Sequence, residues 1–586
     1  MVSPDYCTVT IVVQDPTVER DGKVLTAEVQ IPREELIDGP MGSALYVVDY
    51  DATSRRMYRA APTKDGPPHW QKRDEILADP VFHAWNVYAI VTRTLRRFES
   101  ALGRRVRWGI RGHQLKVVPH AFEDANAFYS PEAEALLFGY IRRGPSASNT
   151  YLCLSHDVVA HEATHALLDG LRGSFISPSS PDQAAFHEAF ADIVALLSVF
   201  SLKEAVEYLV DPRNENEFVD KSVFNPERLA ETDLFGLGES LTHVNALRRS
   251  VGIAPTPGLL DEPGFHEVHR RGEILVGAVM RTLLVAWERR MEDLFPGEDT
   301  LIPRRILVEQ GADIADLLLT MSVRAIDYTP PIHITFAHFL RAMLTADREV
   351  RADDSRYNLR SALREQMAGF GIAGTTQDGD GCWCPPKRKD GLQRNGVHFS
   401  ALQSDDTEMF RHIWGNRGNL HLNPHAFTRI SSVRPCVRSA PDDGFHVRET
   451  VVECTQYLKI AAGELPAYGL APLEKLDPDT QIELRGGSTL ILDEYGDLKF
   501  EISDKLPSLQ GIEPDADADA DAEADRERIQ RWNRRIAYLY ESRSLTDGPR
   551  TAHALALRHR DRNAAENPEA AAAEIVRRAR GAREEW

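Results

Sequence analysis

Apolar and polar side chains alternate along much of the first 79 residues, for example at Val9 and Ile11. A period of two residues places the apolar side chains on one face, so this segment is expected to form half-buried strands. Across residues 80–102 the apolar side chains instead recur at helical spacing, and Gly103 follows where a helix would end. The pattern predicts a β-rich module over residues 1–79, followed by a long amphipathic helix.

The hydrophobic period changes twice more along the chain. It is mainly helical from about residue 157 to residue 372, and alternation returns between residues 482 and 502, where Gly486-Gly487 has the composition of a hairpin turn. We therefore expect an α+β protein. Residues 80–372 would form one mixed domain, and residues 373–508 a β-rich accessory domain.

The end of the chain has the composition of a linker and a tail. Residues 509–525 contain an Asp-Ala repeat of one charge sign, which repels itself and buries little surface, so we expect an acidic low-complexity linker. Residues 526–586 are rich in Arg and Ala at helical spacing. This pattern predicts a solvated helical tail, and a helix that binds a protein partner is the alternative.

Composition narrows the class of protein. The chain of 586 residues is 42% hydrophobic and 27% charged, so it is expected to fold, and its length favours two or more domains. The net charge of −20 argues against nucleic acid as a partner. The sequence starts without a basic segment followed by an apolar one, and it contains no apolar stretch of bilayer length. We expect a cytoplasmic protein without membrane contact, and export of the folded chain is the alternative.

The strongest chemical pattern is His161-Glu162-Ala-Thr-His165. Residues at i and i+4 lie on one face of a helix, so the two imidazoles can bind one zinc ion with Glu162 beside it. Apolar residues on both sides supply a face that such a helix would bury. The alternative is a surface helix on which the two histidines occur by chance.

A catalytic zinc needs a third protein ligand and an open position for water. Glu188 is the candidate, because it lies in a strongly apolar helical segment where carboxylates recur at 188 and 192. Coordination by Glu188, with Asp192 accepting a hydrogen bond from a ligating imidazole, explains both charges in an apolar setting. A pair of core salt bridges is the alternative interpretation.

Together these segments resemble the thermolysin-like zinc metallopeptidases, the gluzincins that carry His-Glu-x-x-His followed by Glu-x-x-x-Asp. The resemblance covers roughly residues 80–372. It implies a two-lobed catalytic domain, with a mixed β-rich lobe, a mainly helical lobe and one catalytic Zn²⁺ in the cleft between them. It further implies endopeptidase activity on a peptide or protein substrate, with Glu162 as the general base for a metal-activated water.

Other segments acquire roles through the same resemblance. Asn126 and Ala127 are similar to the family's edge segment, which holds a peptide substrate in extended form. Leu247 and Arg248 resemble a Leu-Arg segment whose leucine lines a hydrophobic pocket and whose arginine binds a substrate carbonyl, with Arg249 as a rival for the arginine.

His269 is the candidate partner of the oxyanion, because it precedes an apolar pair at the family's spacing, and His266 is its rival. Val158 and Leu247 imply, by analogy alone, a preference for a hydrophobic residue after the cleaved bond.

The chain also departs from the family. Phe175 and Ile176 stand near the position of a second catalytic tyrosine, and neither can donate a hydrogen bond. Asp157 matches a calcium ligand, but Val199 stands where its carboxylate partner is usual, so calcium is doubtful. About eighty residues precede the matching region, so a large inhibitory propeptide is not expected.

Two other functions remain open at this point. The chain could be a zinc-binding pseudoenzyme or interaction protein, or a zinc hydrolase of amides or esters outside proteins. A second zinc site is a weaker hypothesis than buried or free thiols. Its ligands would be Cys382, Cys384, Cys436 and Cys454.

Overall fold

The computed structural model is a mixed structure of helices and strands, which confirms the predicted α+β class. The structure describes the following residues: 5–64, 66–67, 70, 73–142, 149–211, 213, 216–221, 229, 250–297, 300–372, 380–386, 392–393, 397–439, 445–509, 518–542 and 545.

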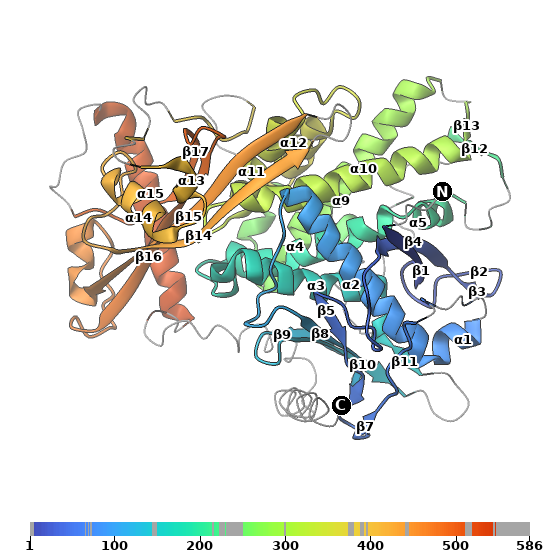
Figure 1. Ribbon diagram of the computed structural model, residues 1–586. Helices are drawn as coiled ribbons and strands as arrows, with labels where there is room; N and C mark the ends of the chain where they lie inside the picture. Colours follow the sequence, from blue (N-terminus) through green and yellow to red (C-terminus); the bar gives the residue numbers. More distant parts are fainter. Residues whose placement is uncertain are drawn as a thin grey trace.

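The N-terminal strands form several small sheets and one larger sheet (Figure 1). Strands β1 and β4 pair antiparallel and pack on the long helix α2, while β5 is hydrogen-bonded to β8 in a five-stranded sheet of order β11-β10-β8-β5, with β9 paired to β10. The elements are β1 (Tyr6–Val12), β2 (Glu19–Arg20), β3 (Lys23–Val24), β4 (Thr26–Pro32), β5 (Leu45–Val47), β6 (Tyr50–Asp51), β7 (Arg56–Met57), α1 (Arg73–Ala78), α2 (Pro80–Leu102), β8 (Leu115–Glu123), β9 (Ala127–Ser130), β10 (Ala135–Ile141) and β11 (Thr150–Tyr151).

The predicted boundary at residue 79 does not separate two structural units. Strand β5 comes from the first 79 residues and pairs in parallel with β8 from the following segment, and the two parts share one hydrophobic core. Sequence periodicity could not show this, because it reports the local period of a strand and not the identity of its neighbour. Helix α2 follows the prediction closely, with Gly103 in the left-handed conformation at its C-terminal end.

The middle of the chain is mainly helical. Helices α3 and α4 run between the sheet that contains β8 and the helices α9 and α10 (Figure 1), and α4 packs against α3, α9 and α10. The elements are α3 (His156–Leu171), α4 (Pro181–Phe200), α5 (Lys203–Val210), β12 (Phe218–Asp220), α9 (Val268–Leu294), β13 (Leu301–Pro303), α10 (Arg304–Ala325), α11 (Phe336–Val350) and α12 (Leu359–Gly369).

One helix among the described residues, α4, is long and apolar enough to cross a membrane by length and composition. Its most apolar window is 94% buried inside the protein, as expected of a central core helix.

The C-terminal part contains a four-stranded antiparallel sheet of order β14-β15-β16-β17, at the opposite end of the molecule from the N-terminal strands (Figure 1). Its elements are α13 (Phe399–Leu402), α14 (Asp406–Gly415), β14 (Phe427–Ser439), β15 (His446–Ala461), β16 (Gln481–Leu492), β17 (Leu498–Asp504) and α15 (Ala518–Glu541).

Buried ion pairs join this sheet to the rest of the protein. Asp327, which is fully buried after α10, is bound by Arg104 at 2.5 Å and by Arg438 of β14 at 2.6 Å. Arg172, at the end of α3, is paired with Glu453 of β15. Arg104 and Arg438 hold the pKa of the Asp327 carboxyl far below its ordinary value despite its burial.

The acidic segment and the tail differ from the prediction. Helix α15 begins at Ala518, inside the expected linker, and its residues Trp532 and Ile536 are buried against the C-terminal sheet. A regular row of alanines and charges is compatible with a helix, and the apolar residues that follow give this helix a face to bury. The first part of the predicted solvated tail is therefore packed, and residues 546–586 lie outside the described residues.

Candidate metal centre

Helix α3 brings His161 and His165 together on one face. The helix is attached at its start to the N-terminal strands, because the backbone N–H of His156 donates to the carbonyl of Gln14 and the Ser155 hydroxyl lies 3.0 Å from Asp15. The two histidines are four positions apart along the helix, and their Nε2 atoms lie 2.9 Å apart.

Helix α4 supplies the third side chain. Ser180 precedes the helix as its N-terminal cap, with its hydroxyl accepting from the backbone N–H of Gln183, and Pro181 is the first helical residue. A Glu188 carboxylate oxygen lies 3.6 Å from Nε2 of His161 and 3.5 Å from Nε2 of His165. Zinc bound tetrahedrally at 2.0–2.1 Å needs donor atoms roughly 3.3 Å apart. The three donors fit one such ion after small adjustments.

A second layer of polar side chains orients both imidazoles. Nδ1 of His161 lies 2.8 Å from the Asp192 carboxylate, one turn after Glu188, as the sequence predicted. Nδ1 of His165 lies 2.8 Å from Nδ1 of His187. The only signal for His187 in the sequence is its adjacency to Glu188, and neighbours on a helix point in different directions, so no role for His187 could be predicted. Both Nε2 atoms are thereby directed to the point where the Glu188 oxygen lies.

Glu162 is buried beside this cluster and is 3% exposed. Its carboxylate accepts a hydrogen bond of 2.9 Å from the backbone N–H of Tyr129 in β9. Burial raises the pKa of Glu162 above its ordinary value, while His161 and His165 act in the opposite direction. A carboxylate that binds protons more readily than usual is suited to accept a proton from water.

Strand β9, whose Tyr129 backbone N–H is hydrogen-bonded to Glu162, lies at an edge of the five-stranded sheet. Strand β9 pairs with β10 through its other side, and the Asn126 carbonyl accepts a hydrogen bond from Gly139. Backbone groups alternate in direction along a strand, so the amide and carbonyl of Ala127 point to the same side as the Tyr129 N–H, toward α3. Asn126 and Ala127 were predicted from the resemblance, whereas no sequence pattern indicates the role of the Tyr129 backbone.

His269 lies in the first turn of α9, and its Nδ1 is 2.8 Å from the Glu267 carboxylate. This pairing, together with the charges of Glu188 and Asp192, raises the pKa of His269 against the opposing effect of burial. The rival His266 is exposed. Glu267 also caps α9 by accepting a hydrogen bond from the backbone N–H of Arg270, and no motif in the sequence indicates this residue.

Val158 is half-buried in the first turn of α3, one turn before His161. Leu247, Arg248 and Arg249 lie outside the described residues.

The residues at which the chain departs from the resembled family are buried in the structure. Phe175 and Ile176 are buried in a short 3-10 helix after α3. Asp157 is buried near Asp15, and burial raises the pKa of Asp157 to about 7, while Val199 is a buried apolar residue of α4.

The four cysteines of the second zinc hypothesis do not converge in the described part of the chain. Three or more His, Cys, Asp or Glu side chains gather at two places there, and neither group includes Cys382, Cys384, Cys436 or Cys454. Cys436 and Cys454 lie on different strands of the C-terminal sheet, where their burial raises the thiol pKa values.

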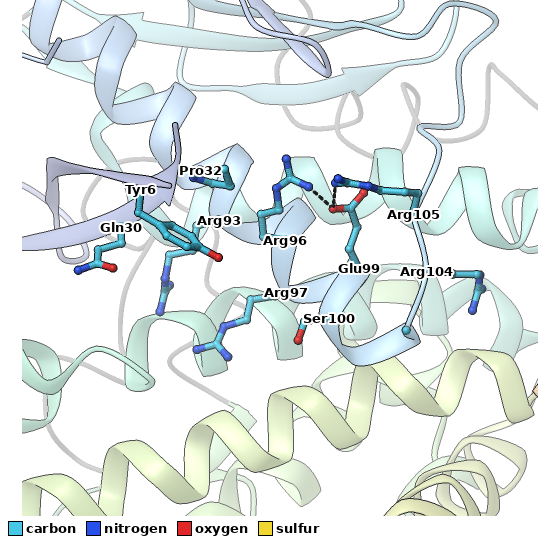
Figure 2. Close-up of a pocket in the computed structure, with 11 residues that line it drawn as sticks. Tyr6, Gln30, Pro32, Arg93, Arg96, Arg97, Glu99, Ser100, Arg104 and Arg105 are labelled. Atoms are coloured by element: carbon cyan, nitrogen blue, oxygen red, sulfur yellow. Dashed lines mark hydrogen bonds and ion pairs between the residues drawn. The ribbon is translucent and has the colours of Figure 1, made fainter. Parts of the chain in front are cut away.

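A separate arginine-rich pocket lies along the C-terminal half of α2, beside Tyr6 and Gln30 (Figure 2). Arg96 and Arg105 both bind Glu99, and Arg104 is held by Asp327. Because these positive charges have carboxylate partners, we assign no ligand to this pocket.

No protein-family model matches the chain, and a search of curated proteins finds no match.

Proposed function

We propose that this protein is a zinc-dependent endopeptidase with a thermolysin-like, two-lobed catalytic domain. The observation that supports the proposal most directly is the convergence of His161, His165 and Glu188 with the buried carboxylate of Glu162. Strand β9 packs against α3, which carries His161, Glu162 and His165, and α9 packs against α4, which carries Glu188. Structural metal sites close all four positions with protein ligands, whereas three ligands with a neighbouring carboxylate are typical of hydrolytic zinc sites.

A zinc ion held by His161, His165 and Glu188 would lower the pKa of a bound water and polarise a carbonyl oxygen. Glu162 accepts the proton of the attacking water and then delivers it to the leaving amine. The hydrogen bond from the Tyr129 backbone fixes the orientation of the Glu162 carboxylate. His269, whose pKa is raised by its contact with Glu267, would donate a hydrogen bond to the oxyanion that develops on the substrate carbonyl.

A peptide in extended conformation is the substrate that best suits the β9 edge. Pairing of its backbone with Ala127 would add a strand beside β9, and Asn126 would hold the adjoining substrate amide. Arg248 would bind a substrate carbonyl, as the resemblance implies. Val158 and Leu247 favour a hydrophobic side chain just after the cleaved bond. The edge position of β9 therefore supports cleavage within polypeptides over attack on small amides or esters.

The test compares the wild-type protein with Glu162→Gln at neutral pH, and zinc content and cleavage of unfolded casein are both measured. The substitution retains the zinc ligands and removes the base, so we expect one zinc at the His161 cluster in each protein and a loss of at least about 100-fold in casein turnover. Glu132→Gln is a matched control, because this exposed carboxylate lies just beyond β9. It should retain full activity.

The alternative functions give different results in the same assay. A zinc-binding interaction protein would contain zinc and cleave neither casein nor ester substrates. A hydrolase of small molecules would cleave esters alone. Absence of zinc from the His161 cluster in the wild-type protein would contradict the whole proposal.

A further inference from the structure

A second cluster of metal-binding side chains lies in the N-terminal part, away from the His161 site. His83 of α2, His120 of β8 and Cys153, just before α3, each present a donor atom within 4.8 Å of the others. All three residues are at most 1% exposed. Nδ1 of His83 and Nε2 of His120 face each other at 2.7 Å.

The outward nitrogens of both imidazoles are already engaged. Nε2 of His83 lies 3.0 Å from the carbonyl oxygen of Ile76, which can only accept, so this nitrogen carries a proton. Nδ1 of His120 lies 2.8 Å from the Asp49 carboxylate and donates to it. When both rings are neutral, Nδ1 of His83 and Nε2 of His120 therefore carry no proton, and each directs a lone pair at the other.

Two lone pairs that face each other at hydrogen-bond distance require something between them. The candidates are an added proton, which makes the pair cationic, or a metal ion bound by both nitrogens, which would move them from 2.7 Å to roughly 3.3 Å apart. The outer contacts favour the metal, because ligating histidines characteristically donate their other N–H to a carboxylate or to a backbone carbonyl. Here His120 donates to the Asp49 carboxylate, and His83 donates to the backbone carbonyl of Ile76. The buried Cys153 thiol adds a soft ligand, which an added proton does not explain.

The surroundings of the cluster are aromatic. The Tyr151 ring lies 4.7 Å from the His83 ring and 5.0 Å from the His120 ring, and the Tyr58 ring lies 4.8 Å from that of His120, all measured between centroids. Such an enclosure limits the access of water and suits an ion held mainly by protein ligands. Two imidazoles and a thiolate match a thiophilic transition metal, either Zn²⁺ with one further ligand or Cu⁺ with three.

We propose that His83, His120 and Cys153 form a second metal site that ties α2, β8 and the start of α3 together. Cys153 lies two residues before Ser155, the N-terminal cap position of α3. A metal bound there would anchor the helix that carries His161 and Glu162 to elements from 33 to 70 residues earlier in the chain, counted from Cys153 to His120 and to His83. The role is structural and does not depend on the proposed peptidase activity.

The experiment is a titration of metal-free, reduced full-length protein with Co²⁺, followed by absorption. A sulfur-to-cobalt charge-transfer band in the near ultraviolet reports the Cys153 site alone, because the His161 site contains no sulfur ligand. We expect two equivalents of cobalt and this band in the wild-type protein. Cys153→Ser should bind one equivalent without the band, and Glu188→Ala should lose the other equivalent and keep the band.

Two controls make the result decisive. Cys384→Ser removes an exposed thiol and should retain the wild-type spectrum. His120→Gln is the second variant at the site, and circular dichroism establishes that each variant is folded. The titration is repeated with Cu⁺ under anaerobic conditions, which separates a copper site from a zinc site. The proposal is overturned if neither metal shows binding that depends on Cys153 in folded protein.

Discussion

Asp192 offers a test of the metal centre that leaves its three proposed ligands in place. Its carboxylate lies 2.8 Å from Nδ1 of His161, within the 2.7–2.9 Å typical of a charge-assisted hydrogen bond. The side chains of His161 and Asp192 are 16% and 18% exposed, so water screens the interaction only in part. Asp192→Ala removes the partner, whereas Asp192→Asn keeps an acceptor oxygen and removes the charge.

The expected loss of zinc affinity follows from the free energy of the hydrogen bond. Hydrogen bonds to charged groups contribute about 1.5–3 kcal/mol, and a tenfold change in affinity corresponds to about 1.4 kcal/mol. Asp192→Ala should therefore weaken zinc binding by roughly 10- to 100-fold, the range found when outer partners of metal ligands are removed. Asp192→Asn should lie between this variant and the wild type.

Zinc affinity is measured by competition with a chromogenic chelator at neutral pH. Asp261→Asn, which removes an exposed carboxylate far from α3 in sequence, should bind zinc as the wild type does. Wild-type affinity in a folded Asp192→Ala protein would refute the argument. It would mean that Asp192 does not orient His161 toward an ion.

Three further predictions concern the oxyanion partner and the junction with the C-terminal sheet. His269→Ala should lower kcat by about 10²–10³-fold with zinc retained, whereas His266→Ala should change kcat little; turnover of a peptide substrate measures both. Glu267→Gln should move the alkaline limb of the kcat/KM profile to lower pH, because the Glu267 carboxylate raises the pKa of His269 and its removal lets the imidazole lose its proton earlier. Asp327→Asn should lower the free energy of unfolding by about 3–5 kcal/mol, measured with denaturant, because Arg438 then lies buried without its full compensation.

Each of these predictions can fail clearly. Equal kcat losses in the two histidine variants would place the oxyanion partner elsewhere, and an unmoved alkaline limb would assign that limb to another group. For the junction, Glu365→Gln is the reference, because this residue forms an exposed pair with Arg289 that should contribute only about 0–1 kcal/mol. An Asp327→Asn variant as stable as Glu365→Gln would contradict the buried-network argument.

Local spacing accounts for most of what could be predicted about the candidate site. The positions of His161 and His165 on one face, and of Glu188 and Asp192 one turn apart, follow from the period of a helix. Periodicity likewise predicted α2 and strands in the C-terminal part, but the hairpin turn expected at Gly486-Gly487 is wrong, because both glycines lie inside β16 and pair with β15. Residues 247–249 were assigned by resemblance alone, and they lie outside the described residues.

The hydrogen-bond partners of His165 and Glu162 could not be predicted from periodicity. His187 meets His165, and the Tyr129 backbone meets Glu162 across 33 residues of chain. These contacts depend on how α3, α4 and β9 pack. The sequence around a polar residue in an apolar segment does not show which distant group will be its hydrogen-bond partner. The pairing of β5 with β8 in the five-stranded sheet could not be predicted either, because it also depends on the packing of segments distant in sequence.

By itself the sequence determined the α+β class, the helical spacing of the candidate zinc ligands and the overall acidity, because each depends on local period or on composition. Only the tertiary structure decided which strands share a sheet, which side chains orient the imidazoles, and that His83, His120 and Cys153 meet. Those arrangements arise from the packing of segments distant in sequence, where burial and hydrogen bonding select partners that local patterns do not specify.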